Sequence, residues 1–471
     1  MKKVFILLLT LFTLQHGVKA QRYLAETFSS VDVDSNVVYG QNYEYYTNFN
    51  QLKDLKMDVY RPSGDVATDR PVIILMHAGS FLPESVTGYA WGNKNQNCVV
   101  EMCKRYARLG YVAVSLSYRI GWNAGGDQET RSKTIIEAVY RAMQDAKTCV
   151  RYFKNDFVSN GNTWGIDTGK IVLGGTNSGA YVAMAAGTLN RVQELELPKF
   201  LDQNLNPFIN QSLLGDFDGF GGTQNFGNYP GISSRFRCII SLGGASADLS
   251  IIESGEPPVI AFHGVNEVTT PYNTDIVITS TGQSVVEVNG AGDYMPEIVA
   301  KGNNAPFQGA GFVQGPPNRN GAGQTTTSVE GLYPCYNQGF EPWSWYNGPN
   351  PAINPSATMQ KAMAYIDTII GYSTPRLYRL LIDPAYTSVE ELSALSGITI
   401  FPNPVRDWVN IQPVDGVNIE RVSFYNLLGA EVYAQQFSSK SVNLSSLSSG
   451  TYMIRLDLAD GRQFISRIIV E

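Results

Sequence analysis

Several features are scarce or absent in this sequence, and each gap excludes a class of function. There are only three histidines, His16, His77 and His263, and the five cysteines show no C-x-x-C spacing. We therefore expect no zinc or other metal site, and no motif indicates a cofactor. Basic residues number 35 against 42 acidic ones and form no stripe, which excludes nucleic-acid binding driven by phosphate neutralisation. No apolar run approaches the roughly 20 residues that span a bilayer, so no transmembrane segment is expected.

The N-terminus has the three parts of a secretory signal peptide, which we place at residues 1–20. A charged start precedes the apolar run from Val4 to Leu14, and small residues follow before Gln21, where the mature chain is expected to begin. The formal charge of −7 becomes about −10 once the three signal lysines are removed. Export to an oxidising compartment would permit at most two disulfides, and Cys98 with Cys103 is the cheapest local pair.

Residues 21–375 alternate between β-rich apolar runs and helical patterns. This alternation predicts β-α-β units in a mostly parallel, doubly wound sheet, an α/β fold. The expected strands are 72–76, 111–117, 171–173, 238–242 and 259–262, and the expected helices are 99–107, 135–153, 181–186 and 357–370. Two stretches without clear periodicity, Asn190 to Phe236 and Gly302 to Pro351, are interpreted as long loops over the C-terminal edge of the sheet.

After a linker at 376–397, residues 398–471 change to short strands separated by turns. The pattern predicts a small all-β sandwich domain. Its expected strands are 398–401, 408–412, 422–426, 452–456 and 464–470.

Four spaced motifs in this module carry a resemblance to a known family. They are Phe401-Pro402-Asn403-Pro404, Tyr425-Asn426-Leu427-Leu428-Gly429, Leu447 to Tyr452 and the terminal Arg467-Ile468-Ile469-Val470. Together they resemble the type A C-terminal sorting domain of the Bacteroidetes type IX secretion system. The resemblance implies export through the periplasm, a secreted or cell-surface location, and the type IX machinery as the partner of residues 398–471. A carbohydrate-binding β-sandwich is the alternative.

The larger unit resembles the secreted carboxylesterases of the α/β-hydrolase fold. His77-Ala78-Gly79-Ser80-Phe81 looks like their His-Gly-Gly-x loop, and Gly175-Thr176-Asn177-Ser178-Gly179 occupies the G-x-S-x-G turn known as the nucleophile elbow. The resemblance implies that backbone N–H groups of Ala78, Gly79 and Ser178 form the oxyanion hole.

The same resemblance to carboxylesterases assigns unusual residues to the three catalytic positions. Asn177 stands at the nucleophile position, Glu267 at the acid position and Phe340 at the base position. Asn has no nucleophilic hydroxyl, and Phe cannot accept a proton. Ser178 is an alternative nucleophile, although it would lie on the first helical turn rather than at the apex of the elbow.

The sequence therefore predicts an exported, non-catalytic hydrolase homologue that binds a small molecule or a polymer. Phe340, Trp343, Trp345 and Tyr346 are the expected pocket residues, with core packing as the alternative role for these aromatics. Two other hypotheses remain open. One is an active carboxylesterase with a non-standard nucleophile such as Ser178, and the other is a structural or adhesive surface protein.

Overall fold

The chain divides into two compact units, residues 1–381 and 382–471. The computed structural model describes residues 22–45, 48–87, 92–267, 269–278, 282–311, 329–345, 358–383, 398–401, 405–413, 418–426, 430–459 and 463–470. The predicted signal peptide at 1–20 lies outside these ranges, as does most of the predicted linker.

The first unit is built on one eight-stranded sheet. Its strands, in spatial order, are β1 (Val31–Glu44), β2 (Asn48–Pro62), β4 (Val112–Leu116), β3 (Arg70–Met76), β5 (Ile166–Thr176), β6 (Cys238–Leu242), β8 (Val259–Gly264) and β11 (Leu332–Cys335). The pairs β1–β2 and β2–β4 are antiparallel, and all later pairs are parallel. This arrangement confirms the predicted α/β fold with a mostly parallel sheet.

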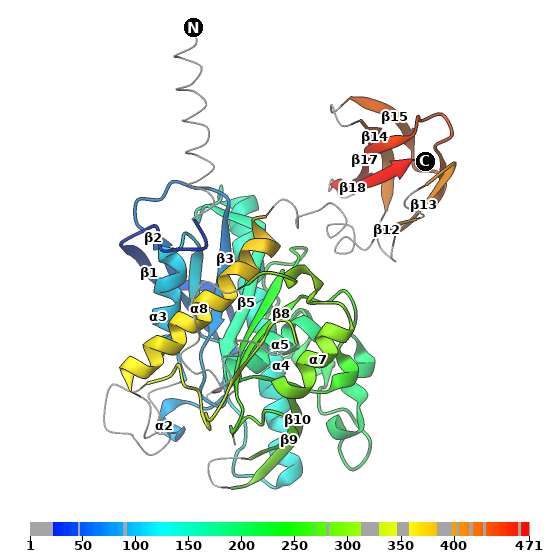
Figure 1. The fold of residues 1–471 in the computed structure, drawn as a ribbon. Coiled ribbons are helices and arrows are strands. Elements are labelled where there is room, and N and C mark those ends of the chain that lie inside the picture. Colours follow the sequence, from blue (N-terminus) through cyan, green and yellow to red (C-terminus); the bar gives the residue numbers. More distant parts are fainter. Residues whose placement is uncertain are drawn as a thin grey trace, which may run out of the picture. The chain divides into compact units, whose positions relative to one another are not determined.

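The central strands are buried on both faces because helices cover the sheet. All seven residues of β3 are buried, as expected for a strand covered on both sides. Alternate residues such as Val72 and Ile74 share a core cluster with α4 (Gln128–Ser159) and α5 (Ser178–Thr188), which pack against each other. On the other side, α3 (Asn97–Arg108) contacts α8 (Met359–Leu381), which crosses the front of the sheet in Figure 1.

Shorter elements complete this unit. They are the helices α2 (Glu84–Thr87), α6 (Gln211–Leu214) and α7 (Ala291–Ala300), the 3₁₀ turns η1 (Val192–Glu196), η2 (Pro198–Phe200), η3 (Leu249–Ile251) and η4 (Ala305–Phe307), and a small sheet of β7 (Ala245–Ser246), β10 (Ser284–Gly290) and β9 (Thr274–Ile278). Among the described residues, none of the helices is both long and apolar enough to cross a membrane.

Two expectations about this unit need correction. The stretch from Gly302 to Pro351, predicted as a loop, contains β11, which pairs with β8 at the edge of the sheet. A four-residue strand with an internal proline leaves almost no pattern in a sequence, and an edge is the place where a sheet tolerates proline. Helix α8 also extends to Leu381, into the predicted linker, because Leu377, Leu380 and Leu381 are buried.

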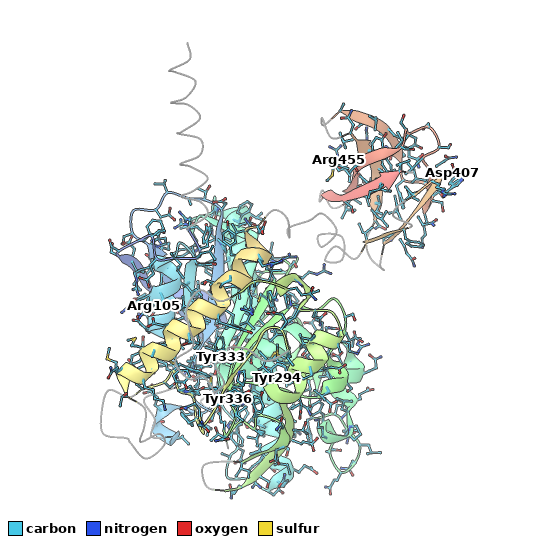
Figure 2. All side chains as sticks on the ribbon, viewed as in Figure 1. Arg105, Tyr294, Tyr333, Tyr336, Asp407 and Arg455 are labelled. Carbon is cyan, nitrogen blue, oxygen red and sulfur yellow. The ribbon has the colours of Figure 1, made fainter. Side chains whose placement is uncertain are left out.

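The interface between α3 and α8 combines buried and surface contacts. The hydroxyls of Tyr106 and Ser373 lie 2.7 Å apart in the interior. At the surface, Arg105 of α3, which is labelled in Figure 2, donates to Asp367 of α8 at 2.7 Å and also pairs with Glu101 one turn earlier. These contacts hold the two helices together on one face of the sheet.

The five cysteines are all free thiols buried in the first unit. Cys98 and Cys103, the local pair that we predicted as the most favourable disulfide, are not bridged. Burial raises the pKa of Cys98 to about 12 and that of Cys103 well above its ordinary value. Both therefore stay protonated, which makes them poor nucleophiles and slow to oxidise.

The second unit is the predicted all-β module. One sheet contains β12 (Ile398–Phe401), β13 (Trp408–Pro413) and β16 (Ser441–Asn443), and the other contains β15 (Glu431–Gln436), β14 (Ile419–Tyr425), β17 (Gly450–Leu458) and β18 (Gln463–Val470). A core that includes Val409, Ile411, Phe424 and Ile454 is fully buried, which is expected when alternate residues of two sheets face each other.

A buried ion pair joins the loop after β4 to α4. Arg119 donates from its backbone N–H and its Nε to Asp145 at 2.8–3.0 Å, and the Asp145 side chain is fully buried. The same loop carries Tyr118 and Trp122, both of which are buried. The ion pair therefore fixes two aromatic side chains relative to α4.

Asp145→Ala should lower the free energy of unfolding by about 3–5 kcal/mol, because the Arg119 guanidinium would remain buried without its partner. Urea denaturation of the mature protein measures the change. Asp127→Ala, at the exposed N-cap of the same helix, is the control and should cost much less. Equal losses in the two variants would contradict the role assigned to the pair.

Candidate active site

The turn between β5 and α5 is the sharpest constraint in the first unit. Asn177 connects the two elements with φ of 47° and ψ of −114°, a conformation that costs free energy for any residue with a side chain. A Cβ at Gly175 would lie 2.4 Å from the backbone carbon of Gly179, and a Cβ at Gly179 would lie 2.4 Å from the carbonyl oxygen of Met76. Only glycine at both positions lets this turn close, which is the geometry of a nucleophile elbow.

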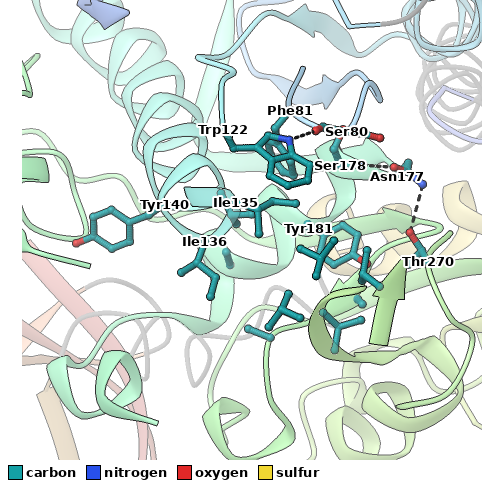
Figure 3. Close-up of a pocket in the computed structure, with 18 of the residues that line it drawn as sticks. Ser80, Phe81, Trp122, Ile135, Ile136, Tyr140, Asn177, Ser178, Tyr181 and Thr270 are labelled. Carbon is teal, nitrogen blue, oxygen red and sulfur yellow. Dashed lines mark hydrogen bonds between the residues drawn. The ribbon is translucent and has the colours of Figure 1, made fainter. Parts of the chain in front are cut away.

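The side chain of Asn177 is held by hydrogen bonds on both of its polar atoms. Its Oδ1 accepts from the backbone N–H of Ser178 at 2.9 Å, and its Nδ2 donates to Oγ1 of Thr270 at 3.2 Å (Figure 3). The side chain at the apex is therefore a neutral amide. Its oxygen therefore accepts a hydrogen bond from one of the three N–H groups that we predicted to form the oxyanion hole.

A second of these three N–H groups is also engaged. The backbone N–H of Ala78 donates to Oε1 of Gln96 at 2.7 Å in a buried contact. Gly79, the third position, has φ of 130° and lines the cavity described below. Two of the three predicted donors thus bond to the protein's own amide oxygens.

Ser178 is the first residue of α5 and lines the same cavity. Its Oγ lies 3.1 Å from the hydroxyl of Tyr118, which donates its own proton to the carbonyl oxygen of His77 at 2.8 Å. The Ser178 hydroxyl is therefore the donor in its bond to Tyr118. Burial raises the pKa of Tyr118, so this phenol is not a base at neutral pH.

The two described histidines are buried and uncharged. Burial lowers the pKa of both His77 and His263 to about 4. The ring of His77 stacks on Tyr118 with centroids 4.4 Å apart, and its Nδ1 lies 2.6 Å from the carbonyl oxygen of Ala78. Nε2 of His263 lies 2.9 Å from the carbonyl oxygen of Thr270. Each imidazole thus has a nearby backbone carbonyl oxygen as its structural partner.

Glu267 follows β8 and its side chain is fully buried. Its Oε1 accepts from Thr269 at 3.0 Å, and its Oε2 lies 3.8 Å from Nε2 of His263. Burial and the neighbouring Glu341 raise the pKa of Glu267 well above its ordinary value. Burial therefore disfavours charge on both the carboxyl at the predicted acid position and the imidazole beside it.

Phe340 lies in the loop after β11 and lines the cavity. The next residue, Glu341, is fully buried, and it accepts from Oγ1 of Thr176 at 2.6 Å and from Oγ of Ser344 at 2.9 Å. Burial raises the pKa of Glu341 to about 7. Glu341 was not predicted as a site residue from the sequence. Its place directly after Phe340, the predicted base position, was the available signal.

The prediction that the aromatic residues after Phe340 line the pocket needs a correction. Trp343 does not line the cavity, because its indole is fully buried and donates from Nε1 to Thr176 at 2.9 Å. Trp345 is also buried and is not among the described lining residues. Tyr346 lies outside the described residues. The Trp343 indole therefore supports the elbow from within the core, and among the described residues of the predicted set only Phe340 lines the cavity.

A cavity of about 400 Å³ opens above the elbow. Figure 3 shows Asn177 and Thr270 at one end and aliphatic side chains between them and Tyr140. Its wall comes from the 78–82 loop, the loop after β4, α4, α5, the stretch from Asn190 to Phe236 and the β9–β10 hairpin. The lining residues include Trp122, Ile135, Ile136, Val139, Leu195, Phe200, Ile209, Val277 and Val285. No group of three or more potential metal ligands occurs within the described part of the chain.

Glu341→Gln should change how stability depends on pH. The folded-state pKa of about 7 lies above the ordinary value of 4.5, so the folded protein holds this proton more tightly than the unfolded chain. The stabilisation is present below pH 4.5 and is lost as the pH rises toward about 7. Across this window the free energy of unfolding of Glu341→Gln should therefore rise relative to that of the unmodified protein.

Urea denaturation at several pH values between 4.5 and 7 tests this expectation. Glu196→Gln, which removes a carboxylate at an exposed position, is the control and should run parallel to the unmodified protein. A Glu341→Gln curve that also runs parallel would contradict the raised pKa.

Two family matches cover parts of the chain. Residues 57–218 match the family BD-FAE, and residues 399–471 match the secretion system C-terminal sorting domain. A curated protein, ulvan lyase NLR42 of Nonlabens ulvanivorans, is 30% identical over 79 residues. That match covers 16% of this chain and 15% of the relative, so the chain spans only a small part of that protein's length.

Among solved structures, the chain is similar to an esterase of Thermogutta terrifontis. The propionate-bound form is 17% identical with a TM-score of 0.39, covering 72% of this chain and 91% of that chain. The butyrate-bound form is 17% identical with a TM-score of 0.40, covering 74% and 94%. The sorting-domain match places the protein outside the cell or on its surface. The first unit therefore has an α/β-hydrolase fold in which residues 57–218 match the family BD-FAE, and residues 399–471 match the secretion system C-terminal sorting domain.

Proposed function

We propose that this protein is an exported binding protein built on an α/β-hydrolase frame and that it does not hydrolyse esters. The observation that carries the proposal is the elbow itself. Asn177 stands at the apex, and its amide oxygen bonds to the Ser178 N–H that would otherwise face an oxyanion. The apex therefore offers no hydroxyl to attack a carbonyl, and the Ser178 N–H is not vacant to stabilise the product of attack.

The proton chemistry around the elbow also supports a non-catalytic role. Ester hydrolysis by a hydroxyl needs a base whose pKa lies near the working pH. Phe340 lines the cavity at the predicted base position, and the imidazoles of His77 and His263 are fully buried with a pKa of about 4. Burial raises the pKa of Glu267, which disfavours its carboxylate form. Glu341 has a pKa of about 7, but its side chain is fully buried, accepts from Thr176 and Ser344, and is not among the described residues that line the cavity. We therefore assign none of these groups as a general base.

An active carboxylesterase using Ser178 is the second candidate, because the Ser178 hydroxyl lines the cavity. Its partner is the Tyr118 hydroxyl at 3.1 Å, which already donates its hydrogen bond to the His77 carbonyl. A Ser178 alkoxide would need a base that this contact does not provide. We therefore favour binding over hydrolysis.

Purified mature protein should hydrolyse short-chain nitrophenyl esters no faster than a denatured control, and a fluorophosphonate probe should not label it. The reason is the amide at the apex and the phenyl ring at the base position. Robust turnover that disappears in Ser178→Ala would instead establish the esterase alternative.

Matched variants separate the missing parts. Asn177→Ser with Phe340→His should gain measurable turnover, whereas each single change should not, because nucleophile and base act as a unit. Turnover in Asn177→Ser alone would show that some other group already acts as the base.

The sorting module makes a separate prediction about export. We propose that residues 1–20 direct the chain into the periplasm and that residues 398–471 engage the type IX machinery. Deleting 398–471 should leave the protein in the periplasm, as measured by cell fractionation and mass spectrometry. Deletion of residues 190–193 from an exposed turn of the other unit is not expected to change the destination. Surface display of the truncated chain would show that the module is not the address.

A further inference from the structure

The wall of the cavity above Asn177 is apolar and almost uncharged. Only one of its described residues, Glu287, carries a charged side chain, which is half exposed and lies 3.7 Å from Lys199. Neither lysine nor arginine is among the described lining residues. A ligand carboxylate or ammonium would therefore lose its hydration without gaining a charged partner, which disfavours its binding.

Polar groups of Asn177, Tyr181 and Thr270 lie at the inner end of the cavity, away from Tyr140, and mainly donate hydrogen bonds (Figure 3). The Asn177 amide nitrogen carries two N–H donors, and only one is needed for the bond to Thr270. The Tyr181 hydroxyl is buried beside Thr270, and no well-formed hydrogen bond satisfies it. Meanwhile Asn177 Oδ1 already accepts from Ser178. This end therefore matches an acceptor oxygen of a ligand rather than a donor.

The size and lining of the cavity restrict the rest of the ligand. About 400 Å³ is within the usual range for small-molecule sites. Aliphatic side chains such as Ile136, Val139 and Val285 would leave most sugar hydroxyls without partners, and an unpaired buried hydroxyl is costly. An apolar body with a single acceptor oxygen at one end satisfies both the wall and the inner end.

We propose that this cavity binds uncharged molecules with an aliphatic body and a terminal carbonyl, and that the Asn177 amide donates to the carbonyl oxygen. The proposal rests on the proposed function, because a bound carbonyl compound stays intact only where no nucleophile attacks it. The residue at the apex of the elbow thus acts as a hydrogen-bond donor for the ligand.

Titration calorimetry of the mature protein with four probes tests the proposal. Methyl nonyl ketone, which cannot be hydrolysed, should bind. Decanoate and decylamine, which have nearly the same chain but carry a charge, should bind at least about tenfold more weakly, as should xylotriose. Equal binding of decanoate, or no binding of the ketone, would overturn the proposal.

Variants then test the donor. Asn177→Asp preserves the size of the side chain and an oxygen for Ser178 but removes the N–H donors, so affinity for the ketone should fall about tenfold. Asn204→Asp makes the same chemical change at an exposed position and should leave affinity unchanged. Unchanged ketone affinity in Asn177→Asp would overturn the role of the amide, and the probe series on the unmodified protein stands whether or not this variant folds.

Methyl decanoate distinguishes failure of this proposal from failure of the proposed function. Release of decanoate by the unmodified protein would overturn the non-hydrolytic function while the ketone result still reports on ligand class. Absence of both hydrolysis and ketone binding would overturn only the ligand assignment.

Discussion

The close approach of β5, α5 and the end of β3 is the constraint on which the rest of the site depends. Gly175 and Gly179 allow backbone atoms to meet where any Cβ would clash, and the chain between them is forced into a positive φ at residue 177. That conformation projects one side chain into the cavity and aims the next backbone N–H at the same point. The strained backbone is retained here although the residue it presents is an amide.

Burial then determines the charge state of the groups around this turn. Burial lowers the pKa of both imidazoles to about 4 and raises the pKa of the Glu267 carboxyl, because each lies in an interior that disfavours charge. In an active hydrolase the acid position stabilises a positive imidazolium during the reaction. The shifts near Glu267 run in the opposite direction, because they disfavour both the carboxylate and the imidazolium.

The sequence predicts the frame of this protein well and its side-chain contacts poorly. Apolar runs of strand and helix length indicate the central sheet, and the glycines around Asn177 locate the elbow, because both signals are local. Strand β11 and the direction of Trp343 depend on which distant residues each meets, and neither leaves a local pattern. Glu341 was missed for a related reason, since a carboxyl is rarely expected in a core until its hydroxyl partners, here Thr176 and Ser344, are known.

The bond from Ser178 N–H to Asn177 Oδ1 affects which side chains position 177 can accept without loss of stability. The first N–H groups of a helix have no partner within the helix, and an Asn side chain just before α5 satisfies one of them. A change to serine would exchange this contact for one from a shorter side chain. Under the proposed non-hydrolytic function, serine alone would bring no activity, so no gain in activity would offset a less stable elbow.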